Sequence, residues 1–427
     1  MKLRLLGGVK PSGRRKVYMG GIFMRAYERL LKYAQYDTAS DGASKTCPST
    51  PGQMVLAKDL AAEMEKIGLS DVRVDENGYV YGCVPANVEG RPVIGLIAHM
   101  DTVDAVPVLP MNPSIIENYD GGVVQLACGD VLDPAVFPDL ARAKGQDLIV
   151  TDGVTLLGAD DKAGIAEILT LCERLMADPS IPHGKVMIGF TPDEEIGRGA
   201  NLFDIPGFGA DFAYTVDGSV VGGIEYECFN GANGVVTIHG RSVHPGSAKN
   251  KMLNASLVAM EFASLLPAEQ TPANTEGYEG FFHLCGIKGE EEQCQMVYIL
   301  RDHDLDKLRA KMALFQSAAD FLNAKYGPGV VEVDVKESYY NMRSVIEPHM
   351  HIIRLAERAY REIGVEPFNV AIRGGTDGAA LSFKGLPCPN LPTGGMNCHG
   401  RFEYITIQDM DKMVDMLEKL VSIEPEG

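Results

Sequence analysis

Short apolar runs that each end on a histidine or a carboxylate are the feature that most restricts the fold of this chain. PVIGLIAHMD, GKVMIGFTPDEE and DFAYTVDG are nearly continuous apolar stretches, and they lead into His99, Glu195 and Asp217. Such runs are typical of buried parallel strands. Between the first two, DDKAGIAEILTLCERLMAD has helical spacing and begins just behind Asp160. The alternation predicts an α/β sheet whose polar side chains meet beyond the carboxyl ends of its strands.

The order of predicted strands and helices changes between residues 229 and 341. GANGVVTIHG, FFHLCGI, QMVYILRD and GVVEVDVKESYY predict strands, and MLNASLVAMEFASLL and LDKLRAKMALFQSAADFLNA predict helices. Their order, β-α-β-β-α-β, is that of a compact α+β domain. A chain of 427 residues also exceeds the roughly 250–300 residues of a single core. We therefore expect a discontinuous catalytic domain with a mixed sheet flanked by helices, at 24–228 and 342–427. A lid domain interrupts it at 229–341, and 1–23 form a basic leader.

The amino-acid composition limits which binding partners and which cellular compartment we expect. The formal net charge is −19 and the pI is near 4.9, which disfavours a phosphate-binding surface, so no nucleic acid partner is expected. Nine scattered cysteines without a CxxC pair predict neither a disulfide framework nor a thiolate zinc site, and favour a reducing cytoplasm. No run reaches the roughly 18 apolar residues of a membrane helix, and the leader lacks the apolar core of a secretory signal.

Five side chains have the chemistry of metal ligands: His99, Asp160, Glu195, Asp217 and His399. Two histidines and three carboxylates can hold two divalent ions if one carboxylate bridges them. Such a pair of ions activates a water and polarises a substrate carbonyl. Mixed nitrogen and oxygen ligands favour zinc and admit manganese or cobalt. The sequence thus predicts two Zn²⁺ per subunit, with Mn²⁺ or Co²⁺ as alternatives.

Two further carboxylates lie beside these ligands. Glu194 precedes Glu195, so one member of the pair can bind metal while the other moves a proton. Asp101, two residues beyond His99, can accept a hydrogen bond from the imidazole and fix its tautomer. Any one of these residues alone is more often a satisfied polar group at a strand end. The combination is what favours a catalytic site.

Seven motifs together resemble the peptidase T family. They are HMDTVD, LLGADDKAGIAEI, TPDEEIG, VDGS, VHPGSAK, RGGTDGAALSFKGLPCPNL and TGGMNCHG. This family comprises tripeptide aminopeptidases among the dinuclear-zinc exopeptidases, which also include carboxypeptidase G and succinyl-diaminopimelate desuccinylase. The resemblance runs from about residue 24 to the C-terminus. It departs at Cys398, where the family usually has a larger tyrosine, and in the lid loop SAKNKMLNA, which bears on peptide length preference.

The resemblance assigns roles to the residues of the catalytic domain. It implies that His99, Asp160, Asp217, Glu195 and His399 are the ligands, with Asp160 bridging. It also implies that Glu194 is the general base, that Asp101 orients a ligand, and that the peptide bond between Asp160 and Asp161 is cis.

For the lid, the resemblance implies that His244 in SVHPGSAK binds the oxyanion when the lid closes. The alternative is that His244 has no catalytic role and is an ordinary loop histidine followed by proline. Arg301 in ILRDHD and Arg373 in IRGGTDG are candidates for holding a substrate carboxylate or backbone. Arg301 has an equally simple alternative, a solvated ion pair with Asp302 or Asp304.

These expectations converge on a metal-dependent aminopeptidase that releases the N-terminal residue from short peptides, chiefly tripeptides. The same site suits a carboxypeptidase or an N-acyl amino acid hydrolase, because the pocket walls alone recognise the ends of a substrate. A non-catalytic metal- or peptide-binding protein is the remaining alternative, and Glu194 weighs against it. The expected partners are short peptides and a second copy of the chain, which forms a homodimer through the lid domain.

Overall fold

The computed structural model describes residues 4–5 and 24–424, and these divide into two compact units. Unit 1 contains the described residues up to Tyr226, then Val345–Val370, and those from Ala380 onward. Unit 2 contains Glu227–Ser344 and Ala371–Ala379. The domain boundaries expected from the sequence stay a prediction. The leader at 1–23 lies outside the described residues, except for the strand β1 (Arg4–Leu5).

Unit 1 is built on a mixed eight-stranded sheet of order β16-β11-β17-β10-β4-β9-β3-β2. Its centre consists of three parallel strands, β10 (Phe212–Gly218), β4 (Ile94–His99) and β9 (Val186–Thr191). The outer strands are β16 (Phe368–Ile372), β11 (Gly223–Cys228), β17 (Asn390–Pro392), β3 (Val80–Val84) and β2 (Ser70–Val74). Every residue of β4 and β9 is buried, as their unbroken apolar sequences predict for strands covered on both faces.

The helix α3 (Ala159–Ala177) carries Asp160 at its start and packs directly on β4 and β10. Its outer side is covered by α1 (Ala26–Tyr33) and α10 (Ile407–Ser422). Fourteen of its residues are buried, so α3 is an interior helix and not an amphipathic surface helix. The other long helices of unit 1 are α2 (Pro51–Ile67), which packs on β2 and β3, and α8 (Met350–Glu362), which packs on α10.

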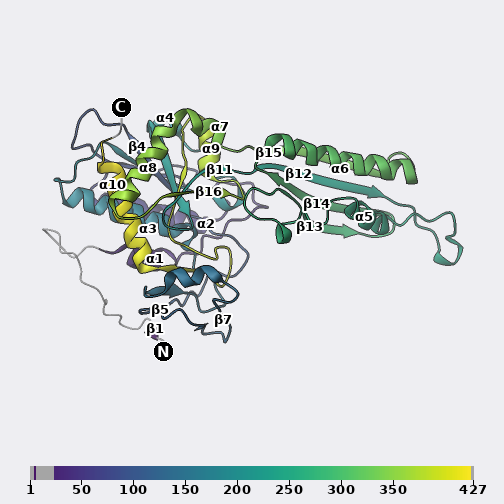
Figure 1. The fold of residues 1–427 in the computed structure, drawn as a ribbon, viewed down its shortest axis with the longest axis horizontal. Coiled ribbons are helices and arrows are strands. Elements are labelled where there is room, and N and C mark those ends of the chain that lie inside the picture. The colour runs from purple at the N-terminus through teal and green to yellow at the C-terminus, as the bar shows by residue number, and fades with distance from the viewer. Residues whose placement is uncertain (1–3, 6–23, 425–427) are drawn as a thin grey trace. The chain divides into compact units, whose positions relative to one another are not determined.

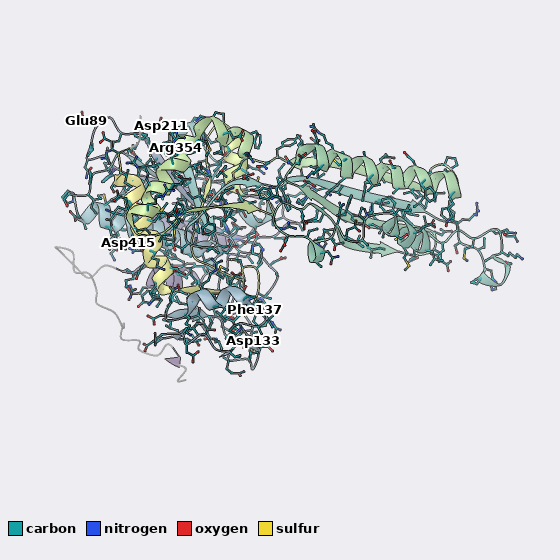
Figure 2. All side chains as sticks on the ribbon, viewed as in Figure 1. Glu89, Asp133, Phe137, Asp211, Arg354 and Asp415 are labelled. Carbon is teal, nitrogen blue, oxygen red and sulfur yellow. The ribbon has the colours of Figure 1, made fainter. Side chains whose placement is uncertain are left out.

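A second, four-stranded sheet in unit 1 has the order β1-β5-β8-β18. Its members and neighbours are β5 (Ser114–Ile116), β6 (Val124–Gln125), β7 (Val131–Leu132), η1 (Pro138–Ala143), β8 (Leu148–Val150) and β18 (Tyr404–Thr406). The ring of Phe137, labelled in Figure 2, lies 5.3 Å from that of Phe402, centre to centre. This contact ties the segment that precedes η1 to the loop that precedes β18.

Unit 2 has the β-α-β-β-α-β order that the sequence predicts. Its antiparallel sheet runs β13-β14-β12-β15, and both helices pack on one face of it (Figure 1). The elements are β12 (Asn230–His239), α5 (Ala255–Ser264), β13 (Phe281–Gly289), β14 (Gln293–Asp302), α6 (Leu305–Tyr326) and β15 (Val331–Tyr339). The α6 side chain of Phe315 is fully buried in the core between helices and sheet.

Short elements complete the described chain: η2 (Glu194–Ile196), α4 (Ile205–Phe208), η3 (Pro245–Ser247), η4 (Pro272–Asn274), α7 (Arg343–Ile346), η5 (Glu347–His349) and α9 (Asp377–Phe383). Among the described helices, none combines the length and the apolar sequence needed to cross a membrane.

Candidate metal centre

Three of the predicted ligands come from three neighbouring parallel strands. His99 is the last residue of β4, Asp217 is the residue before the end of β10, and Glu195 follows β9 in the turn η2. Because β4 lies between β10 and β9 and runs parallel to both, the carboxyl ends of all three strands meet at one edge of the sheet.

The other two ligands reach this edge from different segments. Asp160 is the second residue of α3, and its peptide bond to Asp161 is cis, as the family resemblance implied. His399 lies in the loop between β17 and β18 with a φ of 66°, a left-handed conformation that only a few per cent of non-glycine residues adopt.

The five side chains form two groups that share Asp160. His99 Nε2 lies 2.9 Å from Asp160 Oδ1 and 3.4 Å from Asp217 Oδ1. His399 Nε2 lies 3.0 Å from Asp160 Oδ2 and 3.1 Å from Glu195 Oε2. In each group, one ligand atom per residue lies within 4.8 Å of the others. Asp160 therefore presents one oxygen to each group, which is the arrangement of a bridging carboxylate.

The donor set fits two divalent cations. Glu195 Oε1 is buried and has no hydrogen-bond partner among the described residues. No described group therefore offsets the cost of removing this carboxylate oxygen from water. Burial raises the pKa of Asp217 to about 6, against the opposing effect of His99, and burial also raises the pKa of Glu195. A crowded, desolvated set of carboxylates with two imidazoles is the ligand chemistry of zinc and related ions.

The two histidines show that the cluster attracts positive charge. Hydrogen bonds to Asp160 and Glu195 raise the pKa of His399 to about 11. Burial by itself would lower the pKa of His99, but the carboxylates of Asp217, Asp101 and Asp160 outweigh burial and raise it well above its ordinary value. In both cases the neighbouring carboxylates raise the pKa of the imidazole, and the same negative charge would favour a bound cation.

Asp101 is fully buried between His99 and the turn η2. His99 Nδ1 lies 3.0 Å from the backbone oxygen of Asp101 and 3.4 Å from its carboxylate. The carboxylate accepts hydrogen bonds from the backbone N–H of Glu194, at 2.9 Å, and of Glu195, at 3.1 Å. Asp101 is therefore placed to hold the turn that carries both glutamates as well as the ligand His99.

Glu194 is the first residue of η2 and its side chain is half-buried. The turn begins at Asp193, which has a left-handed φ of 58° and a fully buried carboxylate. That carboxylate accepts hydrogen bonds from Ser49 N–H at 2.8 Å and from Gln53 Nε2 at 2.7 Å. These contacts fix the direction in which Glu194 and Glu195 leave the sheet.

Sequence reasoning missed the anchoring carboxylate of Glu403. It is 1% exposed and accepts hydrogen bonds from the backbone N–H of Leu157, Gly158 and Asp160. The available signal was a glutamate between two aromatic residues, Phe402 and Tyr404, immediately before an apolar strand. Asp161, considered before only for its cis bond, likewise accepts a hydrogen bond from His99 N–H at 3.1 Å.

The remaining predicted site residues belong to unit 2. His244 is exposed at the start of η3, and its Nδ1 accepts a hydrogen bond from Gly246 N–H at 3.1 Å. Arg301 Nη1 donates to the backbone oxygens of Ala232 and Leu300, and its guanidinium lies over the ring of Tyr339.

Arg373 is held by its own unit. Its guanidinium donates to Gly277 O at 2.8 Å, Glu279 O at 2.9 Å and Thr275 Oγ1 at 2.8 Å, and it lies over the ring of Phe229. Unit 1 therefore contains all five predicted ligands together with Asp101 and Glu194.

Comparison with known sequences gives consistent matches over most of the chain. A family model described as "Peptidase family M20/M25/M40" matches residues 151–423. The chain is 51% identical over 403 residues to peptidase T of Clostridium perfringens, covering 94% of this chain and 99% of that protein. It is 52% identical over 402 residues to peptidase T of Caldanaerobacter subterraneus, covering 93% and 98%.

Solved structures share the fold. Aminopeptidase PepT from Bacillus cereus matches with a TM-score of 0.71 and 23% identity, over 93% of this chain and 97% of that chain. A tripeptidase from Staphylococcus aureus matches with a TM-score of 0.73 at the same identity and coverage. A dinuclear metal binding peptidase of the M20 family from Bacillus subtilis matches with a TM-score of 0.59 and 13% identity, over 93% and 96%.

Proposed function

This chain belongs to the peptidase T group of peptidase family M20/M25/M40, and we propose that it releases the N-terminal residue from short peptides, chiefly tripeptides, with two divalent metal ions. Its family membership makes the protein a hydrolase that acts on peptide bonds. The observation that carries the metal-dependent part of the proposal is Asp160, whose two oxygens face two separate ligand groups.

One cation would be held by His99, Asp160 and Asp217, and the other by Asp160, Glu195 and His399. We propose Zn²⁺ at both positions, with Mn²⁺ or Co²⁺ as alternatives, because the donors are mixed nitrogen and oxygen atoms. When bound, such a pair of ions polarises the scissile carbonyl and lowers the pKa of a water.

The proton transfers are assigned to Glu194. Its carboxylate takes a proton from the attacking water and returns it to the leaving amine, as a general base and then a general acid. Asp101 supports this role because its carboxylate holds the backbone N–H groups of Glu194 and Glu195. A fixed backbone lets the side chain of Glu194 act from one position.

Three residues of unit 2 are part of the proposal because the motifs that contain them resemble those of the peptidase T family. His244 would donate a hydrogen bond to the carbonyl oxygen of the substrate, which becomes an oxyanion during attack. Arg301 and Arg373 would hold the substrate carboxylate or backbone. A cytoplasmic location and a homodimer formed through the lid remain part of the proposal. The first is supported by the nine cysteines, all of which are free thiols.

The deciding experiment compares a free tripeptide with its N-acetylated form, its C-amidated form and an N-acetylated single amino acid. Each is tested with metal-loaded and chelator-treated protein. We expect metal-dependent hydrolysis that acetylation abolishes and amidation does not. Hydrolysis lost on amidation alone would indicate a carboxypeptidase. Cleavage of an acetylated single amino acid would indicate an N-acyl amino acid hydrolase. Metal binding without turnover of any substrate would indicate a metal- or peptide-binding protein.

A further inference from the structure

Buried carboxylates connect the segments that carry the ligands. Asp161, beside the shared ligand Asp160, accepts a hydrogen bond from the backbone N–H of His99. Asp101, beside His99, accepts hydrogen bonds from the backbone N–H of Glu195 and its neighbour. Asp161 and Asp101 are both 0% exposed. In each case the anchor for one ligand belongs to the segment that carries another ligand.

Glu403 makes the third connection of this kind. Its Oε2 accepts hydrogen bonds from the N–H groups of Leu157, at 3.0 Å, and Gly158, at 2.8 Å, and its Oε1 accepts from Asp160 N–H at 3.1 Å. These amides lie at the start of α3, where backbone N–H groups have no partner inside the helix and favour an anion. Glu403 follows the ligand His399 by four residues.

The backbone around Glu403 is itself fixed. Met396 and Tyr404 exchange backbone hydrogen bonds of 2.9 and 3.0 Å, which close the loop that contains His399. Thr151 Oγ1 donates to Arg401 O at 2.7 Å from the neighbouring strand end. Because the loop is closed in this way, the Glu403 carboxylate gives the start of α3 a defined position relative to His399.

We propose that Glu403 is a positioning residue for the metal centre and sets where Asp160 places its two oxygens. This inference rests on the proposed two-metal function. Asp160 contributes to both ligand groups, so a displacement of its backbone disturbs both groups at once. Glu403 acts only through the backbone of α3 and the preceding loop. Lys162 is fully buried, and burial lowers its pKa to about 8 although the negative charge of Glu403 opposes that effect. Its ammonium group donates to Tyr36 O at 2.9 Å.

The test is Glu403→Gln, in which an NH₂ group replaces one oxygen that faces backbone donors. We expect Zn²⁺ to bind the metal-stripped full-length variant about 10–100-fold more weakly, measured by calorimetry or chelator competition. At saturating metal, KM for a tripeptide should equal the wild-type value, because Glu403 contacts only protein. Zn²⁺ affinity equal to that of the wild type would refute the inference.

The matched control is Asp304→Ala. Asp304 caps α6 in unit 2 by accepting hydrogen bonds from the N–H groups of Asp306, at 2.9 Å, and Lys307, at 3.0 Å. Removing this cap should lower the thermal midpoint without changing Zn²⁺ affinity. If Asp304→Ala weakens Zn²⁺ binding as much as Glu403→Gln, the effect of Glu403 is general destabilisation and the inference is wrong.

A measurement on the metal-free wild type decides the question if Glu403→Gln does not fold. Hydrogen exchange should show protected amides at Leu157, Gly158 and Asp160, and rapid exchange there contradicts the anchor. The inference and the proposed function fail separately. Wild-type protein that binds two Zn²⁺ without cleaving any peptide rejects the function, whereas an active wild type with an unaltered Glu403→Gln variant rejects the inference alone.

Discussion

At the scale of single residues, the proposed mechanism gives ligand chemistry to Glu195 and proton chemistry to the adjacent Glu194. The carboxylate of Glu195 lies 3.1 Å from His399 Nε2, while Glu194 precedes it in the same short turn. We expect Glu194→Ala to keep its metal and to lose about 10²–10⁴-fold in kcat, the usual contribution of a general base. Metal analysis and kcat, measured on the same preparation, check this.

The neighbouring substitution is the control for that prediction. Glu195→Ala should lose metal from the group that contains His399, because it removes a ligand. A Glu194→Ala variant with substantial activity, or one without metal, contradicts the division of roles.

Glu167 makes the stability of the protein depend on pH. It is fully buried in α3, and neither carboxylate oxygen has a hydrogen-bond partner among the described residues. Burial raises its pKa well above the ordinary value of 4.5. Above that pH the unfolded chain releases the proton while the folded chain keeps it. The free energy of unfolding therefore falls as pH rises, by up to about 1.4 kcal/mol per pH unit until the folded pKa is reached.

Glu167→Gln removes this titration, so the stability of the variant relative to the wild type should increase between pH 5 and pH 8. Urea unfolding at several pH values measures the difference. Glu65→Gln, on the exposed side of α2, is the control and should follow the wild type, because solvent hydrates that side chain in both states. A constant difference between Glu167→Gln and the wild type would count against the prediction.

The proposed ligands could be picked out from the sequence because four of the five are distinctive side chains that follow an apolar run. Glu403 could not, because it acts on backbone N–H groups, which every residue except proline provides. No side-chain pattern at Leu157 or Gly158 indicates that a carboxylate binds there. The same reason concealed the contact between Asp161 and the amide of His99.

At the scale of elements, the close packing of α3 on β10 sets the distance between two ligand-bearing segments. A Cβ atom on Gly164 would lie 2.0 Å from Val216 O and 2.5 Å from Asp161 Oδ1. Gly164→Ala must push the helix away from the strand, so we expect roughly 1–3 kcal/mol of destabilisation together with weaker metal binding. Thermal unfolding and metal content measure the two effects.

Gly286→Ala in β13 provides the comparison, because no atom lies within 4 Å of a Cβ built there. It should leave metal content unchanged. Normal metal content in Gly164→Ala would show that the contact between α3 and β10 does not position Asp160.

The individual elements could largely be predicted, and the order of the strands could not. Apolar runs predicted β4, β9 and β10, and helical spacing predicted α3 and both helices of unit 2. Strand β17, however, lies between β10 and β11, which are consecutive in the sequence. It has three residues and pairs with Thr215 across a separation that no local pattern encodes. Such pairing depends on tertiary packing and not on propensity.

At the scale of the whole molecule, all five proposed ligands belong to unit 1. The comparisons confirm the predicted peptidase family and fold class. Metal binding should therefore stabilise unit 1 selectively, by about 4 kcal/mol at a free metal concentration of 1,000 times Kd. Hydrogen exchange with and without chelator should show a change in β4 and β10 and none in β12 and β14. An equal change in both units would contradict this.

The hydrogen bond between Glu403 and Asp160 N–H spans 243 residues of chain. At about 5–20 residues per second, the ribosome needs roughly 10–50 s to pass from one partner to the other. All of unit 2 is synthesised in that interval. The nascent polypeptide therefore has no anchored Asp160 while it is being translated, and the ability to cut peptides arises only as a late event of synthesis.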